Sequence, residues 1–140
     1  MSTLAVGTIK SVSSAAPVFQ NTSGTEKGQL VKAYVSFDGT TNSGGNCSIY
    51  DSFNVDSVSD NGTGDYTVNF TGGTFSNGNY CISGSISFGT TQSRNILNVA
   101  TTAQTTYTAP TATALRLESV NYGNGNSYDA NFVSIAIFGG

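Results

Sequence analysis

The sequence predicts an all-β protein: a single-domain two-sheet sandwich, jelly-roll-like in its connections, with about eight strands. Gly, Ser, Thr and Asn make up about half of the 140 residues, and these types favour turns and strands over helices. Apolar residues alternate with polar ones in several short runs, which is the period of a half-buried strand. No segment keeps a helical period, and turn-forming residues separate the runs.

Composition excludes several classes of protein. The chain has no His, so it offers no imidazole as a metal ligand, catalytic base or pH switch. It carries 5 basic and 8 acidic residues, whereas a nucleic-acid binder needs a basic surface. No apolar run approaches the roughly 18 residues of a membrane helix. We therefore expect no nucleic-acid partner, no membrane insertion, no metal and no cofactor.

Residues 1–29 differ from the rest of the chain. Their apolar residues are too sparse to form a core, so we predict an extended N-terminal arm with one short strand, followed by a β-sandwich head over residues 30–140. The candidate attachment or oligomerisation residues of the arm are Leu4, Val6, Ile9, Pro17, Val18 and Phe19. The alternative interpretation is an unstructured terminus.

Alternation predicts the strands of the head. In LVKAYVSF it places Leu30, Lys32, Tyr34 and Ser36 on one face and Val31, Ala33, Val35 and Phe37 on the other. In CSIYDSFNV the same rule places Cys47, Ile49, Asp51, Phe53 and Val55 on one face. Asn61-Gly62 between two β-patterned runs predicts a hairpin. Further strands are predicted in YCISGSISF, RNILNVATT, TALRLESVNY and FVSIAIF.

Groups with catalytic or metal-binding chemistry show no recognised pattern. The loop from Asp60 to Asp65 carries oxygens suited to Ca²⁺ but lacks the EF-hand spacing, so a hairpin turn is the favoured interpretation. The spacing of the carboxylates selects no pair for glycoside hydrolysis. Cys47 and Cys81 have no His to activate them. We expect both thiols to be reduced and each side chain to pack as a small, buried apolar group. We predict no catalytic residue.

The best candidate for a ligand contact is the loop NYGNGNSYD at residues 121–129. Tyr beside Asn, Ser and Gly is typical of polar recognition surfaces. The candidate contact residues are Tyr107, Asn121, Tyr122, Asn124, Asn126 and Tyr128. An equally weighted interpretation is that the tyrosines pack on a sheet edge and tether the loop.

Several runs together resemble one known family. LVKAYVSFDGT, SIYDSFNVDSVSDNGTGDYTVNFT, GNYCISGS and FVSIAIFG resemble a β-rich domain of tail fibres and other virion proteins of marine bacteriophages, cyanophages among them. The matching segments are Lys32–Phe37, Ser52–Ser57, Asp60–Phe70, Asn79–Tyr80 and Val133–Gly139. The most specific is the run DNGTGDYTVNF. Residues 89–130 show no match.

The resemblance implies a structural role in the virion. The family has no catalytic residues that could be assigned to positions of this sequence. On this basis we expect a short homotrimeric tail-fibre or knob-like component, synthesised in the host cytoplasm and located in the virion. Its arm would bind other virion proteins, and its head would contact host glycan or protein during adsorption. The alternative is a capsid cement or decoration protein with a purely structural role. A carbohydrate-active enzyme is the least favoured hypothesis.

Overall fold

Strands form all the regular secondary structure in the part of the chain that the structure describes. The computed structural model describes residues 18–20, 22–23, 26–88, 95–99, 101–102 and 106–140. No helix occurs in these ranges, so the all-β prediction is confirmed. The strands are β1 (Val18–Gln20), β2 (Glu26–Gln29), β3 (Val31–Ser43), β4 (Asn46–Phe53), β5 (Val55–Gly62), β6 (Asp65–Phe70), β7 (Tyr80–Ser87), β8 (Asn95–Val99), β9 (Thr101–Thr102), β10 (Thr106–Tyr107), β11 (Ala114–Asn121), β12 (Asn126–Ser127) and β13 (Phe132–Gly139).

The chain divides into two compact units, Met1–Leu30 and Val31–Gly140. In the first unit β1 pairs antiparallel with β2, with Val18 opposite Gln29 and Phe19 opposite Gly28. The other arm candidates lie outside the described residues: Leu4, Val6, Ile9 and Pro17.

Nine strands of the second unit form one antiparallel sheet. Its order is β12-β11-β6-β5-β4-β3-β13-β7, and β8 pairs with the other edge of β11. β3 to β6 follow one another as a meander, and β13 returns to lie between β3 and β7. β7 lies beside β8, where a Cβ on Gly84 would stand 3.0 Å from Leu97 Cδ2. The sheet therefore nearly closes on itself, and separate sandwich sheets with jelly-roll-like connections are not confirmed.

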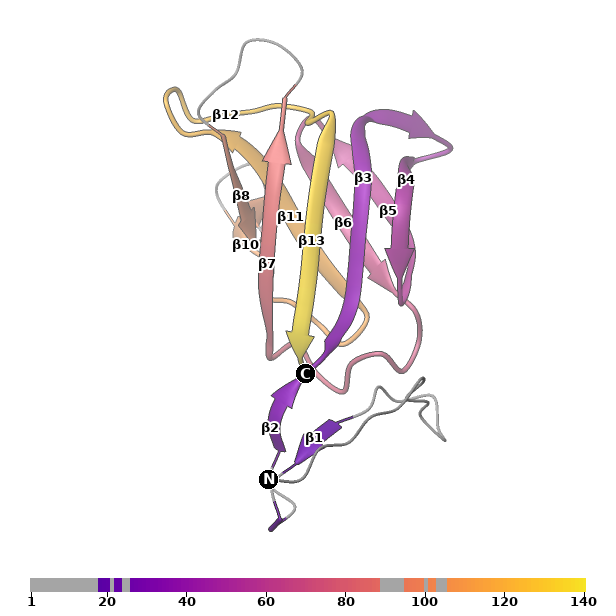
Figure 1. Ribbon diagram of the computed structural model, residues 1–140. Coiled ribbons are helices and arrows are strands. Elements are labelled where there is room, and N and C mark those ends of the chain that lie inside the picture. Colours follow the sequence, from indigo (N-terminus) through magenta and orange to yellow (C-terminus); the bar gives the residue numbers. More distant parts are fainter. Residues whose placement is uncertain (1–17, 21, 24–25, 89–94, 100, 103–105) are drawn as a thin grey trace. The chain divides into compact units, whose positions relative to one another are not determined.

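The core lies between two walls of this sheet. Figure 1 shows β4, β3, β13 and β7 in front of β5, β6, β11 and β8. The front wall contributes alternate residues, as predicted for β3: Ala33, Val35, Phe37, Val133, Ile135 and Ile137. The rear wall contributes Val58, Tyr66, Val68, Phe70, Leu115 and Leu117. Burying each large apolar side chain stabilises the fold by about 1.5–3 kcal/mol.

A β-bulge interrupts the pairing of β4 with β3. Ile49 lies opposite Phe37 and Asp51 lies opposite Ser36, so Tyr50 is an extra residue on β4. In a bulge two successive residues oppose one residue of the partner strand, and the side-chain alternation shifts by one position.

The bulge corrects the predicted face of β4. Cys47 and Ile49 pack with the core, and so does Val55 at the start of β5. Asp51 and Phe53, beyond the bulge, are exposed on the outer surface. The prediction that all five side chains share one face is therefore wrong, because the alternation changes phase at the extra residue.

Candidate functional site

The predicted contact loop is the hairpin that joins β11 to β12. Asn121 lies opposite Asn126 and is buried. Its Oδ1 accepts a hydrogen bond from Gly123 N at 2.8 Å, and its carbonyl oxygen accepts one from Gly125 N at 2.8 Å. The Oδ1 of Asn124 accepts one from Asn126 N at 3.0 Å. The side chains of Asn121 and Asn124 therefore bond to the backbone of the turn and shape it.

The three candidate tyrosines have different surroundings. Tyr122 and Tyr107 are 63% and 67% exposed, and Tyr107 lies in β10, which pairs with β9. Tyr128 is half-buried, and its ring packs edge-on against Phe88 with the centroids 6.4 Å apart. Its hydroxyl accepts a hydrogen bond of 3.2 Å from Asn124 Nδ2, which lowers the pKa of Tyr128. Tyr128 thus fits the tethering interpretation, whereas Tyr122 is exposed at the surface.

The carboxylates of the acidic loop bond to protein groups. Asp60 accepts from Gly62 N at 2.9 Å and from Asn42 Nδ2 at 2.7 Å. Asp65 pairs with Arg116, whose Nε donates at 2.8 Å. These contacts support the turn interpretation. Among the described residues no three His, Cys, Asp or Glu side chains are grouped to hold a metal ion.

The two cysteines are free thiols in unlike surroundings. Cys47 is buried as predicted, and its burial raises the pKa of the thiol to about 11. Cys81 lies on β7 opposite Phe138 and is exposed, so the prediction of a buried role is wrong for Cys81. A thiol pKa far above neutral leaves almost no thiolate at Cys47, and such a thiol is a poor nucleophile.

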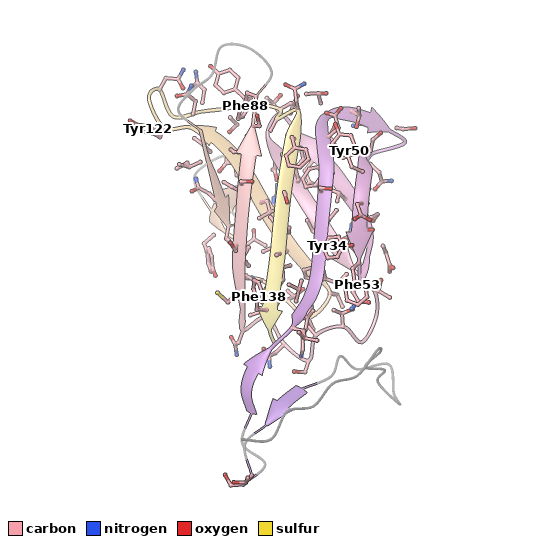
Figure 2. All side chains as sticks on the ribbon, viewed as in Figure 1. Tyr34, Tyr50, Phe53, Phe88, Tyr122 and Phe138 are labelled. Atoms are coloured by element: carbon pink, nitrogen blue, oxygen red, sulfur yellow. The ribbon has the colours of Figure 1, made fainter. Side chains whose placement is uncertain are left out.

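A second group of exposed aromatic side chains lies on the outer surface of β4, β3 and β13. Its four members are Tyr34, Tyr50, Phe53 and Phe132. Figure 2 shows Tyr34, Tyr50 and Phe53 along β3 and β4, while Tyr122 lies at the opposite side of the same view. Together with the carboxylates of Asp38 and Asp51, these four residues form what we call the aromatic face.

The rings of the aromatic face form two cross-strand pairs. Tyr34 lies opposite Phe53, with the ring centroids 6.1 Å apart and the planes at 27°. Tyr50 and Phe132 have centroids 5.9 Å apart and planes at 18°. Tyr50 points outward because it follows the core residue Ile49, and it meets Phe132 across β3.

Register fixes the distance between the pairs. Val133 lies opposite Phe37, which puts Phe132 level with Asp38. Asp38 is four residues from Tyr34 along β3, and four residues of strand span about 13 Å. The two ring pairs are therefore separate platforms on one face of the sheet.

Hydrogen bonds fix the tyrosine hydroxyls of both pairs. Tyr34 donates to Asp51 Oδ2 at 3.2 Å, and this bond raises the pKa of Tyr34. Tyr50 donates to the carbonyl oxygen of Asn131 at 3.1 Å. Partial burial, and then the nearby charge of Asp38, raise the pKa of Tyr50. Both phenols therefore stay neutral at physiological pH.

Asp38 stays ionised at the same pH. Its Oδ1 accepts hydrogen bonds from the hydroxyl and amide of Thr40, at 2.6 and 2.9 Å. The bond from the Thr40 hydroxyl is the main cause that lowers the pKa of Asp38. The aromatic face thus combines apolar ring surfaces with fixed anionic acceptors.

Sequence reasoning gives the outward orientation of single residues of this face, Phe132 among them, and misses how they come together. Alternation places Tyr34 opposite to the core residues of β3, which is a sufficient signal that it points outward. Tyr50 and Phe132 come from distant parts of the chain, and only the strand order brings β13 beside β3. Nothing local in the sequence marks the bulge.

Comparison with known proteins identifies no relative of this chain. No family model, no curated protein and no solved structure matches it. Within the described ranges, no helix is long and apolar enough to cross a membrane.

Proposed function

We propose that this protein is a structural component of a bacteriophage virion. It is a short, trimeric tail-fibre or knob-like part that contributes to host adsorption and has no enzymatic activity. Residues 1–29 attach it to other virion proteins, and residues 30–140 form its head. The observation that carries this proposal is the run Asp60–Phe70, the most specific of the segments that resemble marine-phage fibre domains.

The run spans the end of β5, the turn and all of β6, and its glycines and Tyr66 fit the geometry of this hairpin. Gly62 and Gly64 have φ of 130° and 69°, a region that other residues rarely adopt. A Cβ on Gly64 would stand 2.8 Å from Ser119 O and from Tyr128 N. Tyr66 fills the core. The resemblance thus rests on residues that determine the fold of the head, which supports a shared structural role.

Open strand edges support assembly with further copies of the chain. β4 pairs with β5 only at Asn46 and Ser59, and within the described residues no register pair joins β7 to β8. Such edges expose backbone groups that natural proteins cover or pair. In the homotrimer that we propose, each copy covers edges of the next.

Quantitative mass spectrometry of purified virions tests this function. We expect a copy number in the low tens, divisible by three, relative to the major capsid protein. Deleting residues 1–29 should remove the protein from particles, while circular dichroism of the purified variant still shows the β structure of the head. A copy number close to that of the capsid protein would favour the cement role. Absence from the particle would refute both.

A further inference from the structure

We propose that the aromatic face binds a neutral glycan, and that this face rather than the loop at residues 121–129 makes the host contact. The inference deepens the adsorption role proposed above and rests on it. It assigns ligand contacts to Tyr34, Tyr50, Phe53, Phe132, Asp38 and Asp51.

The two ring pairs provide the apolar part of such a site. A pyranose ring has an apolar C–H face, which packs on the electron-rich face of an aromatic ring. Tyr50 is 56% exposed and Phe53 is 47% exposed, so each platform keeps surface for a ligand. Two platforms about 13 Å apart suit an oligosaccharide of several units rather than a single sugar.

Small polar side chains lie between the two platforms. Ser36 is opposite Ser134 on one side and opposite Asp51 on the other. Their hydroxyl groups can donate and accept, and the carboxylate of Asp51 accepts only. An oligosaccharide that extends from one platform to the other can form hydrogen bonds through its hydroxyl groups at each of these positions.

Charge selects a neutral ligand. Asp38 and Asp51 are the ionisable acids of the face, and both accept hydrogen bonds from polyol donors. Lys32 also lies on the outward side of β3, where its Nζ donates to Gly140 O at 2.6 Å, so two acids stand against one base. A sulfated or uronic-acid glycan would meet two carboxylates, so we expect it to be rejected.

The same charges argue against a second copy of the chain as the occupant. A two-fold contact would bury Asp38 and Asp51 against their own counterparts or against apolar rings, and burying unpaired charge is costly. The trimer contacts proposed above use strand edges instead of this face. An oligosaccharide leaves the carboxylates partly hydrated and bonds to them. The fixed tyrosine hydroxyls also reduce the ordering cost of binding.

The test is titration of the full-length protein with neutral hexasaccharides (cello-, laminari-, manno- and maltohexaose) and with anionic alginate and carrageenan oligosaccharides. Binding is followed by NMR shifts of ¹⁵N-labelled backbone amides. We expect at least one neutral hexasaccharide to shift amides around Ser36, Tyr50 and Ser134. Tyr50→Ala and Phe53→Ala should each weaken binding about tenfold. The matched control Tyr122→Ala removes an exposed tyrosine outside the face and should bind as the wild type does.

Four results would overturn the inference. They are no binding of any neutral hexasaccharide at millimolar concentration, equal binding of the anionic set, loss of binding in Tyr122→Ala, and self-association that Tyr50→Ala abolishes. The last result would identify a second copy as the occupant. If Tyr50→Ala fails to fold, Asp51→Asn tests the same site while preserving shape. Binding by a protein absent from virions refutes only the proposed function, and a virion protein that binds no neutral glycan refutes only this inference.

Discussion

The hydroxyl of Tyr66 accepts a hydrogen bond of 3.1 Å from the backbone amide of Ala130 and donates one of 3.3 Å to Gly39 O. The side chain is fully buried on β6, and its ring packs edge-on against Phe37 with the centroids 5.2 Å apart. Gly39 lies on β3, and its amide donates to Ala130 O at 2.8 Å. One phenol therefore ties the rear wall of the sheet to β3 and to the segment before β13.

Removing this hydroxyl should destabilise the head. Tyr66→Phe leaves the buried amide of Ala130 without its acceptor, which costs about 1–3 kcal/mol. Urea unfolding should show a lower midpoint with an unchanged slope. Tyr107→Phe, which removes an exposed hydroxyl, is the control and should unfold as the wild type does. Equal midpoints for the two variants would contradict the role given to Tyr66.

Gly39→Ala should also destabilise the head, for a steric reason. A Cβ at this position would stand 2.2 Å from Tyr66 Oη and 2.9 Å from Ala130 O. Relieving that overlap has to move a core side chain or backbone, at a cost of about 1–3 kcal/mol. Gly72→Ala is the matched control, because nothing lies within 4 Å of a Cβ there. A wild-type melting temperature for Gly39→Ala would show that the packing around Tyr66 is looser than described.

Stability should fall in alkaline solution. Burial raises the pKa of Cys47 from its ordinary value of 9.0 to about 11 and raises the pKa of Tyr80 to about 12. The folded state then holds protons that the unfolded state has lost, so the stability from Cys47 is complete below pH 9 and is lost as the pH rises through 11.

The Cys47 contribution can be isolated by substitution. Between pH 9 and 10, measured in the presence of a reductant, the free energy of unfolding should fall by about 1 kcal/mol more in the wild type than in Cys47→Ala. Cys81→Ala changes an exposed thiol and serves as the control. Parallel pH profiles for all three proteins would mean that Cys47 is not shielded from water.

The two thiols should differ in accessibility. A thiol-specific reagent should label one cysteine per native chain, at Cys81, and both cysteines after denaturation, because only Cys81 is exposed. Peptide mapping identifies the site, and Cys81→Ser should label only when unfolded. Native labelling of Cys47 at a comparable rate would show that the wall around β4 opens readily.

The sequence is sufficient for the elements whose information is local. The alternation from Val31 to Phe37 predicts which side chains of β3 enter the core. Asn61-Gly62 predicts the β5–β6 hairpin, although these two residues end β5 and the turn itself is Thr63-Gly64. The face of β4 is not predictable in this way, because the bulge at Tyr50 depends on how β4 registers with β3. The aromatic face has the same limit, since Phe132 reaches it only through the placement of β13.

The loop candidates show a different limit of sequence reasoning. From the sequence, the side chain of Asn121 suits ligand contact and turn formation equally well. In the structure its Oδ1 accepts a hydrogen bond from Gly123 N, which assigns it to the turn. The residue type determines which hydrogen bonds a side chain can form. Only its neighbours in the structure determine which of them it forms within the protein.

The bulge at Tyr50 shifts the side-chain alternation of β4 and so divides the strand into two segments with different roles. Asn46–Ile49 supplies core side chains, while Tyr50–Phe53 supplies surface ones. A combinatorial library that randomises Tyr50, Asp51 and Phe53 therefore alters surface chemistry without touching hydrophobic packing. Deleting Tyr50 would instead remove the bulge and leave a regular alternation, in which Ile49 and Phe53 keep their faces and one outward aromatic ring is lost. The extra residue therefore lets β4 present two successive side chains, Tyr50 and Asp51, on the outer surface, and diversification that keeps both proceeds by substitution.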